Sequence, residues 1–162
     1  IYPELGLQSI HDQTAKAMNR GHDYQTFLNT FAKLKNTRLK TVIHLMNGYP
    51  TESKAMMVET AIAVGALKPY GIKIHMLNIL DHTALGAAHR LRYFDLLDQE
   101  EYENLVIHQL QWIPSEVVIM RLTGDGDAAE VLAPQWVRNK TSVLNGIDKK
   151  MARWKVTQGD FL

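Results

Sequence analysis

Ionisable and amide side chains recur at alternate positions of four short segments that have the composition of β-strands. Successive side chains of a strand point to opposite faces, so residues two apart share a face. One face of each segment is apolar and the other carries polar groups. In the last segment, residues 117–121, Ile119 is predicted to share the face of Arg121. The ionisable and amide groups on these polar faces are Glu4, Gln8, His44, Lys73, His75 and Arg121.

If the four polar faces point the same way, these side chains converge on one place. Charged groups are seldom buried unless they are paired or used. One interpretation is a set of internal ion pairs, such as Glu4 with Lys73 or with Arg121. The other is a polar pocket at the carboxyl ends of parallel strands, where such sheets bind ligands. The residues by themselves leave both interpretations open.

The elements that must position these groups are strands alternating with helices. Apolar and β-branched runs predict strands at residues 4–8, 40–46, 72–77 and 117–121. Helical spacing of apolar residues fills the intervals between them. Strands and helices that alternate in this way predict an α/β fold with a parallel sheet and right-handed crossovers.

Local signals predict where several helices begin. Thr51 is expected to cap a helix that ends near Ala66. Asp98 and Glu101 have the spacing of a capping box. Pro134 suits the first turn of the last helix.

Length and composition narrow the class of protein. The chain has 162 residues, 46% of them hydrophobic, with a formal net charge of +1 and no Cys. We expect a folded domain without disulfides, and no thiolate-ligated cluster formed by this chain alone. No apolar run approaches the roughly 20 residues of a membrane span, and no signal peptide is recognisable, so we expect a cytoplasmic location. A complete eight-stranded barrel takes about 250 residues, so four strands make a small open sheet or part of a curved barrel.

Three segments, in order along the chain, resemble the later half of the radical S-adenosylmethionine (radical SAM) fold. The first is ELGLQS at residues 4–9 followed by NRGH at 19–22, and the second is HLMNGYPTE at 44–52. The third covers the remainder and includes RLTGD at 121–125 and LAPQW at 132–136. They look most like the branch that contains oxygen-independent coproporphyrinogen dehydrogenase and the Elongator catalytic subunit. RLTGD followed by LAPQW is similar to a bacterial subfamily labelled Fe–S oxidoreductase.

The resemblance implies roles toward S-adenosylmethionine for four residues. Gln8 matches a side chain that contacts this molecule. Arg20 matches the arginine that pairs with its methionine carboxylate, a role that suits a guanidinium fork. His44 matches a ribose-binding position, and Met46 matches an apolar position that packs against adenine. The resemblance also implies a substrate pocket in the same barrel, for which the candidates are Glu4, Lys73, His75 and Arg121.

The resemblance further implies S-adenosylmethionine and a 4Fe-4S cluster as cofactors. In the family a CxxxCxxC motif holds the cluster, and reductive cleavage of S-adenosylmethionine gives a 5′-deoxyadenosyl radical that abstracts hydrogen from a substrate. Because this chain has no Cys, the cluster ligands are expected outside it, and no metal site is expected on its own residues. We therefore expect the C-terminal part of a longer radical SAM enzyme, inactive alone. The turn GYPT at 48–51 departs from the usual Gly-Leu-Pro-Gly.

The expected architecture is part of a (β/α) TIM-like radical SAM barrel, with parallel strands and outer helices. Residues 1–126 would form the C-terminal half of the barrel, and residues 127–162 a C-terminal helical extension packed on it. A partial barrel exposes strand edges and apolar surface, so self-association of the chain is expected.

The alternative hypothesis is a non-catalytic α/β module that binds transfer RNA or a protein partner through the same barrel mouth. The resemblance to the Elongator subunit makes transfer RNA the first nucleic acid to consider. The near-neutral net charge is an argument against strong non-specific binding to nucleic acid.

Overall fold

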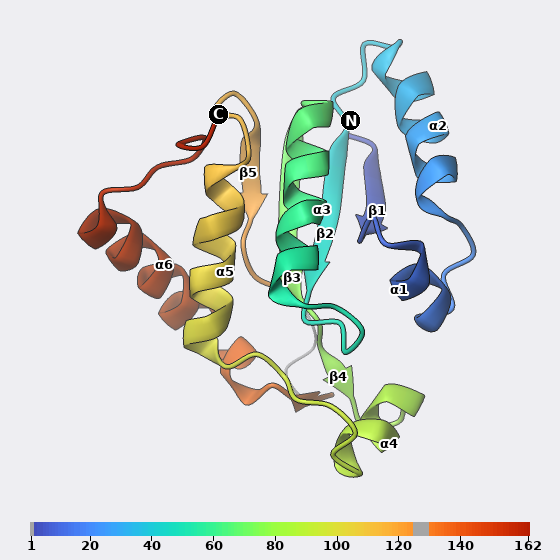
Figure 1. The fold of residues 1–162 in the computed structure, drawn as a ribbon, viewed down its shortest axis with the longest axis vertical. Coiled ribbons are helices and arrows are strands. Elements are labelled where there is room, and N and C mark those ends of the chain that lie inside the picture. The colour runs from blue at the N-terminus through green and yellow to red at the C-terminus, as the bar shows by residue number, and fades with distance from the viewer. Residues whose placement is uncertain (1, 125–129) are drawn as a thin grey trace.

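Four parallel strands form the main sheet in the computed structural model, which describes residues 2–124 and 130–162 (Figure 1). The sheet order is β1-β2-β3-β5, and every neighbouring pair is parallel. The strands are β1 (Glu4–Gln8), β2 (Val42–Asn47), β3 (Gly71–Met76) and β5 (Val118–Arg121). The predicted α/β class and the four predicted strands are confirmed, with ends that differ by at most two residues.

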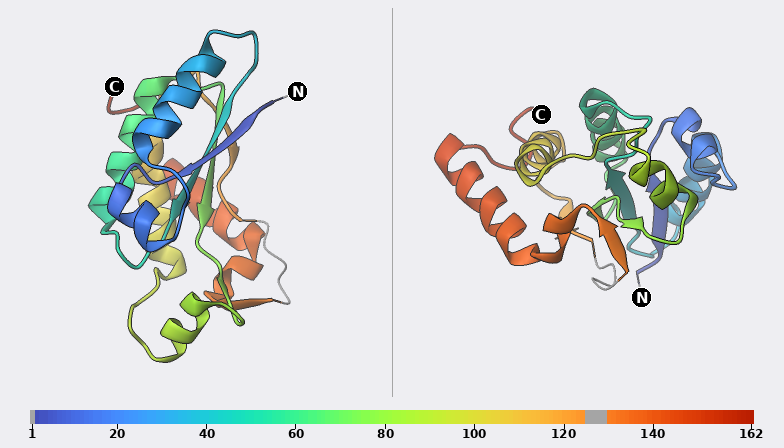
Figure 2. Two further views of the ribbon diagram at one scale, coloured as in Figure 1. Left: turned by 90° about the vertical axis from the view of Figure 1, so that its right-hand side faces the viewer. Right: turned by 90° about the horizontal axis from the view of Figure 1, so that it is seen from below.

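Three helices cover one face of this sheet, as Figure 2 shows. They are α2 (Tyr24–Lys35), α3 (Lys54–Leu67) and α5 (Gln99–Gln111), and the short helix α1 (Asp12–Ala17) follows β1. Alternate residues of β2 and β3 face these helices and are almost completely buried. This shared core includes Ile43, Leu45, Ile72 and Ile74 from the strands and Phe27, Phe31, Val64, Val106 and Leu110 from the helices. Its apolar area accounts for the packing of the helices on this side of the sheet.

A small second sheet lies beyond the carboxyl ends of the main strands (Figure 1). It consists of β4 (Ile79–Leu80) and β6 (Val131–Ala133), which pair antiparallel beside α4 (Ala84–Arg90). Together with Tyr49, these elements form a separate apolar cluster, which we call the satellite cluster: Tyr49, Leu77, Ile79 and Ala133. The sequence patterns did not predict this sheet, because two- and three-residue strands carry no usable periodicity.

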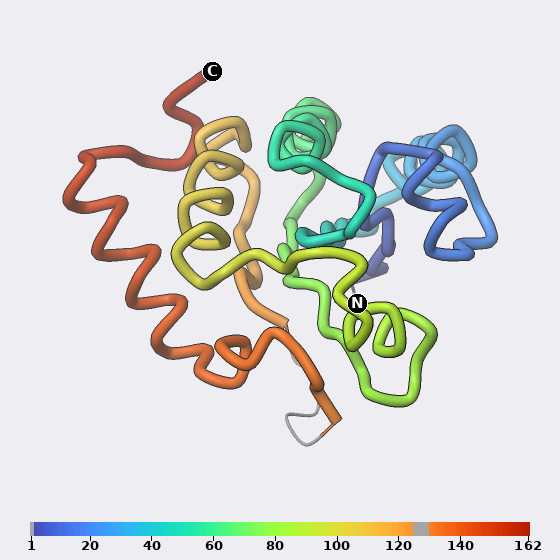
Figure 3. The backbone as a smooth tube through the Cα atoms, turned by 60° about the horizontal axis from the view of Figure 1, so that its bottom comes forward, coloured from blue at the N-terminus to red at the C-terminus, as the bar shows by residue number. Residues whose placement is uncertain are grey.

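The end of the chain runs along α5. Helix α6 (Lys140–Trp154) lies beside α5 (Figure 3), and the 3₁₀ helix η1 (Gln135–Arg138) precedes it. The prediction of one helix beginning at Pro134 was therefore wrong. Asn139 interrupts it, because its side chain accepts a hydrogen bond from the Ser142 amide and caps α6 as a separate helix.

Two other predicted helix starts have different outcomes. The capping box of Asp98 and Glu101 is confirmed at the start of α5. Helix α3 begins two residues later than predicted, because Ser53 accepts the Met56 amide as its cap. The Thr51 hydroxyl instead lies 3.2 Å from the Thr14 hydroxyl.

Two register shifts change which side chains share a face. In the pairing of β3 with β5, Ile72 lies opposite Ile119 and Lys73 lies opposite Arg121, so β5 contains one extra residue. The prediction that Ile119 shares the face of Arg121 was wrong, since Ile119 packs against the core. In β1 a second shift between Gly6 and Gln8 places Gln8 opposite Leu45.

Some expectations concern residues outside the described ranges. Asp125 of the RLTGD segment lies there, as does the predicted domain boundary after residue 126. Within residues 2–124 and 130–162, no helix is long and apolar enough to span a membrane.

Candidate functional site

Glu4 on β1 contacts side chains of β2 and β3 on the face of the sheet that carries the polar groups. Its Oε2 lies 2.6 Å from His44 Nε2 on β2. The Lys73 ammonium on β3 donates to both carboxylate oxygens of Glu4, at 2.8 and 2.7 Å. The predicted ion pair between Glu4 and Lys73 is therefore confirmed, and His44 joins it.

The electrostatics of this cluster favour an ionised carboxylate. The hydrogen bond from Lys73, followed by that from His44, holds the pKa of Glu4 below its ordinary value. The Lys73 side chain is only 13% exposed, whereas the Glu4 side chain is 42% exposed, so the lysine is mostly buried and its carboxylate partner stays in contact with water. The His75 ring stacks on the His44 ring with a centroid separation of 5.3 Å and an interplanar angle of 12°.

Gln8 and Arg20 meet above Gly6. A Cβ on Gly6 would lie 3.2 Å from Gln8 Nε2 and 3.5 Å from Arg20 Nη2. Arg20 Nη2 also donates a hydrogen bond to the Gly6 carbonyl oxygen at 2.5 Å. Gly6 therefore leaves the space in which these two side chains, twelve residues apart in sequence, come together.

The backbone of Gln8 has an unusual conformation. Its φ of 72° lies in the left-handed region, which residues other than glycine adopt at a cost of about 1–2 kcal/mol. The register shift in β1 ends at this residue. Strained residues of this kind concentrate at functional sites, and here the strain occurs where the side chain turns toward Arg20.

Two polar atoms of this pair lack partners. Gln8 Oε1 and Arg20 Nε are buried, and no described residue forms a hydrogen bond with either atom. Leaving a buried polar group unpaired costs about 1–3 kcal/mol. An unpaired acceptor and an unpaired donor on two side chains that meet above Gly6 are what a polar ligand would satisfy.

The carboxyl edge of β2 adds an aromatic group, Tyr49, near Arg20, and a thioether group, Met46. Burial raises the pKa of the Tyr49 hydroxyl to about 12, although the nearby Arg20 charge opposes this rise. Met46 packs against the satellite cluster to which Tyr49 belongs. Gly48, between them in the sequence, has a φ of 96°, a conformation that residues with a side chain rarely adopt.

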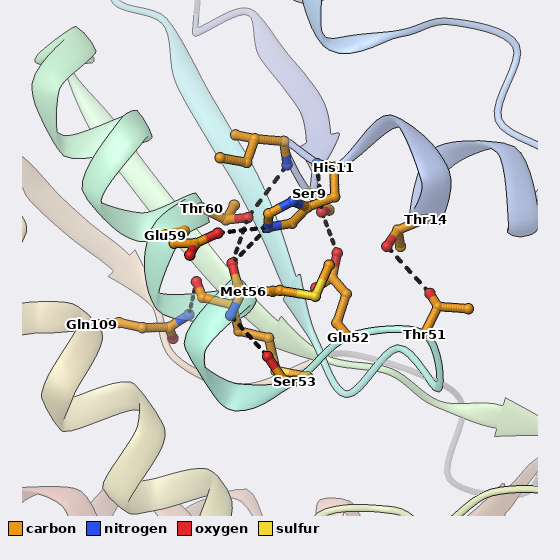
Figure 4. Close-up of polar contacts among 12 residues, drawn as sticks. Ser9, His11, Thr14, Thr51, Glu52, Ser53, Met56, Glu59, Thr60 and Gln109 are labelled. Carbon is orange, nitrogen blue, oxygen red and sulfur yellow. Dashed lines mark hydrogen bonds and ion pairs between the residues drawn. The ribbon is translucent and has the colours of Figure 1, made fainter.

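Polar contacts brace the loop after β1 against the start of α3 (Figure 4). Ser9 donates a short hydrogen bond to Glu52, and His11 Nε2 lies 3.0 Å from the Met56 carbonyl oxygen. The Ile10 amide also donates to the Thr60 hydroxyl. Since this loop follows Gln8 and leads to Arg20, the contacts fix the segment that carries both residues.

A buried pair of amide side chains links the carboxyl end of β2 to helix α5. Asn47 and Gln109 exchange two hydrogen bonds, at 2.8 and 2.9 Å, and Gln109 also donates to the Met57 carbonyl oxygen. Sequence reasoning assigned no role to this pair or to the contacts of Ser9 and His11. The partners lie more than 40 residues apart, and these residue types are common in loops, so no sequence signal would have found them.

The sequence-predicted site residues thus form two neighbouring groups. The first group is Glu4, His44, Lys73 and His75, with Arg121 in register beside Lys73 on the next strand. The second group is Gln8 with Arg20. Met46 is the register partner of His75 and lies between the first group and the satellite cluster.

The described residues contain no group of three or more His, Asp or Glu side chains placed to hold a metal ion. The chain also has no Cys, so it cannot supply thiolates to an iron–sulfur cluster. What its residues can do is bind a polar ligand. Arg20 offers charge-assisted donors, Gln8 offers an amide, and the imidazoles of His44 and His75 can donate or accept.

A parallel α/β sheet with outer helices, with Gln8 at the carboxyl end of β1, defines the class as part of an α/β barrel. Residues 69–153 match the family model of the Radical_SAM C-terminal domain. The chain therefore belongs to the radical SAM family.

Similar proteins support this assignment. YtqA of Bacillus subtilis is 38% identical over 161 residues, which are 99% of this chain and 50% of YtqA. The tRNA uridine(34) acetyltransferase of Methanocaldococcus infernus is 26% identical over 80% of this chain and 25% of its own length. The solved structure of Elp3 from the same archaeon has the same fold, with a TM-score of 0.76, 24% identity, and coverage of 91% of this chain and 35% of that one. The chain spans about half the length of YtqA.

Proposed function

We propose that this chain is the C-terminal part of a radical SAM enzyme and forms part of its S-adenosylmethionine site. The observation that carries the proposal is the pair of Gln8 and Arg20 over Gly6, with the buried Gln8 Oε1 and Arg20 Nε unpaired among the described residues. Membership in the radical SAM family supports it.

Each residue of the proposed site has a task that its chemistry suits. Arg20 pairs with the methionine carboxylate, and Gln8 hydrogen-bonds the same end of the ligand. His44 bonds a ribose hydroxyl, and Met46 packs against the adenine ring. The contacts of Ser9 and His11 hold the loop in place, so these groups are positioned before the ligand arrives.

This chain cannot itself ligate the iron–sulfur cluster of the proposed enzyme, but it can border the cluster site. With no Cys here, its ligands come from another part of the proposed enzyme. When bound, the cluster supplies the electron that cleaves S-adenosylmethionine to methionine and a 5′-deoxyadenosyl radical for hydrogen abstraction. The role of this chain is to bind and orient S-adenosylmethionine and to keep water from it, and the chain alone is inactive in this reaction.

Substrate and partners belong to the same proposal. Lys73, His75 and Arg121 border the substrate, with Glu4 balancing the charge of Lys73. Transfer RNA is the first substrate to test, because one relative is named a tRNA uridine(34) acetyltransferase. Residues 1–126 would act as the half barrel and 127–162 as its helical extension. The edges of β1 and β5 would allow the chain alone to self-associate, which sedimentation at several concentrations would detect.

The test uses the whole protein, reconstituted anaerobically with iron and sulfide. Dithionite and S-adenosylmethionine are added and 5′-deoxyadenosine is quantified. We expect product, and we expect product formation to fall strongly in Arg20→Ala but not in Arg90→Ala, an exposed arginine on α4. A reconstituted cluster that binds no S-adenosylmethionine would contradict the proposal and favour a non-catalytic module that binds transfer RNA or a protein.

A further inference from the structure

Glu4 bonds one particular nitrogen of the His44 ring. The distance from His44 Nε2 to Glu4 Oε2 is 2.6 Å. An ionised carboxylate only accepts hydrogen bonds, so Nε2 must carry the proton in this contact. A neutral imidazole has a single N–H, which leaves Nδ1 with a free lone pair.

The contacts around Glu4 and His44 also fix the plane of the ring. Lys73 donates to both oxygens of Glu4, so this carboxylate cannot rotate freely. On one side the His44 ring stacks on His75, with only 12° between the two planes. The ring is therefore held at its edge by a carboxylate and at one face by an aromatic neighbour, and Nδ1 has a defined direction.

Nδ1 remains available to a ligand. None of the described residues forms a hydrogen bond with it, whereas Nε2 is occupied by Glu4. The His44 side chain is 21% exposed, enough for a small polar group to reach it.

We propose that Glu4 is a positioning residue that fixes His44 as its Nε2–H tautomer, so that Nδ1 accepts a hydrogen bond from a hydroxyl of the bound ribose. This inference rests on the proposed function, which places S-adenosylmethionine beside His44. Under this inference, Glu4 and His44 together determine which nucleosides the site binds. A nucleoside that lacks the bonded hydroxyl leaves Nδ1 without its donor, so the site discriminates against it.

A merely structural Glu4 would behave differently. If its task were only to neutralise Lys73, removing its charge would weaken the fold or the binding of every nucleoside equally. A positioning role predicts a loss of discrimination, because Glu4→Gln keeps the size of the side chain but allows the amide to donate to Nε2. The His44 proton then moves to Nδ1, which no longer accepts.

The experiment measures dissociation constants in the whole protein for S-adenosylmethionine and for its 2′-deoxy and 3′-deoxy analogues. We expect the wild type to bind S-adenosylmethionine about tenfold or more tightly than one of the analogues. Glu4→Gln should reduce this ratio to about threefold or less. The matched control is Glu101→Gln, since the pKa of Glu101 is also lowered by a lysine hydrogen bond, from Lys54, but Glu101 lies on the outer layer. The control should keep the wild-type ratio.

A second readout needs no ligand. Imidazole ¹⁵N shifts should show His44 as the Nε2–H tautomer in the wild type and a gain of the Nδ1–H form in Glu4→Gln. The inference is overturned if the wild type does not discriminate, if Glu4→Gln keeps the discrimination, or if the proton of wild-type His44 resides on Nδ1. In the first two of these outcomes S-adenosylmethionine still binds, and the third is measured without ligand, whereas no binding of S-adenosylmethionine at all overturns the proposed function itself.

Discussion

Replacing Gln8 with glycine should stabilise the fold and weaken ligand binding at the same time. Gln8 has a φ of 72°, which glycine adopts without strain. Its Oε1 is buried with no hydrogen-bond partner among the described residues. Both features cost stability, and the proposed reason they persist is that the side chain binds S-adenosylmethionine.

The expected magnitude is the sum of three contributions. Releasing the left-handed backbone gains about 1–2 kcal/mol, while the extra freedom of glycine in the unfolded chain costs about 0.5–1 kcal/mol. Removing the unpaired buried oxygen gains about 1–3 kcal/mol. The free energy of unfolding should therefore rise by about 1–4 kcal/mol. The lost hydrogen bond should weaken S-adenosylmethionine binding about fivefold.

Urea unfolding, followed by tryptophan fluorescence, measures the first effect, and calorimetric titration of the whole protein measures the second. Lys155→Gly is the matched control, because Lys155 has a φ of 56° at the end of α6 and is exposed. This control should gain about 1 kcal/mol or less and leave the affinity unchanged. A less stable Gln8→Gly beside a stabilised Lys155→Gly would refute the reasoning about strain at the site.

Three further predictions concern the surroundings of the site. Gln109→Leu leaves the buried Asn47 amide unpaired and should lower the free energy of unfolding by about 2–4 kcal/mol, measured in urea; an unchanged midpoint would contradict this. Gly146→Ala places a Cβ against the buried Glu103 carboxylate, so it should cost about 1–3 kcal/mol in the same assay, and no loss would mean that α6 shifts freely. Because the folded pKa of Glu4 is lowered, its contribution to stability is present above the ordinary glutamate pKa and is lost as pH falls through the folded pKa. Glu4→Gln should flatten the acid side of the stability profile, and an identical profile would count against the ion pair.

Sequence patterns predicted the parts of this fold that depend on local composition. The strands around Ile43 and Ile72 are apolar and β-branched, and the capping box at Asp98 is a local signal. Alternation along β1, β2 and β3 also predicted that Glu4 and Lys73 would meet. These features follow from residues close in sequence or from the two-residue period of a strand.

The remaining features depend on partners that are distant in sequence. A register shift reverses the alternation of a strand, and nothing local marked the extra residue that separates Ile119 from Arg121. The short strand β4 pairs with β6, which lies some 50 residues later in the chain. The strained Gln8 was predicted as a site residue from resemblance, but its left-handed backbone follows from the shift in β1.

The most direct test of the proposed site asks whether Arg20 recognises a carboxylate. Titration calorimetry on the whole protein would compare S-adenosylmethionine with its decarboxylated analogue, in the wild type and in Arg20→Ala. We expect the wild type to prefer S-adenosylmethionine about tenfold or more, and Arg20→Ala to bind both compounds equally. A preference that survives in Arg20→Ala would contradict the placement of the methionine carboxylate beside Gln8 and Arg20.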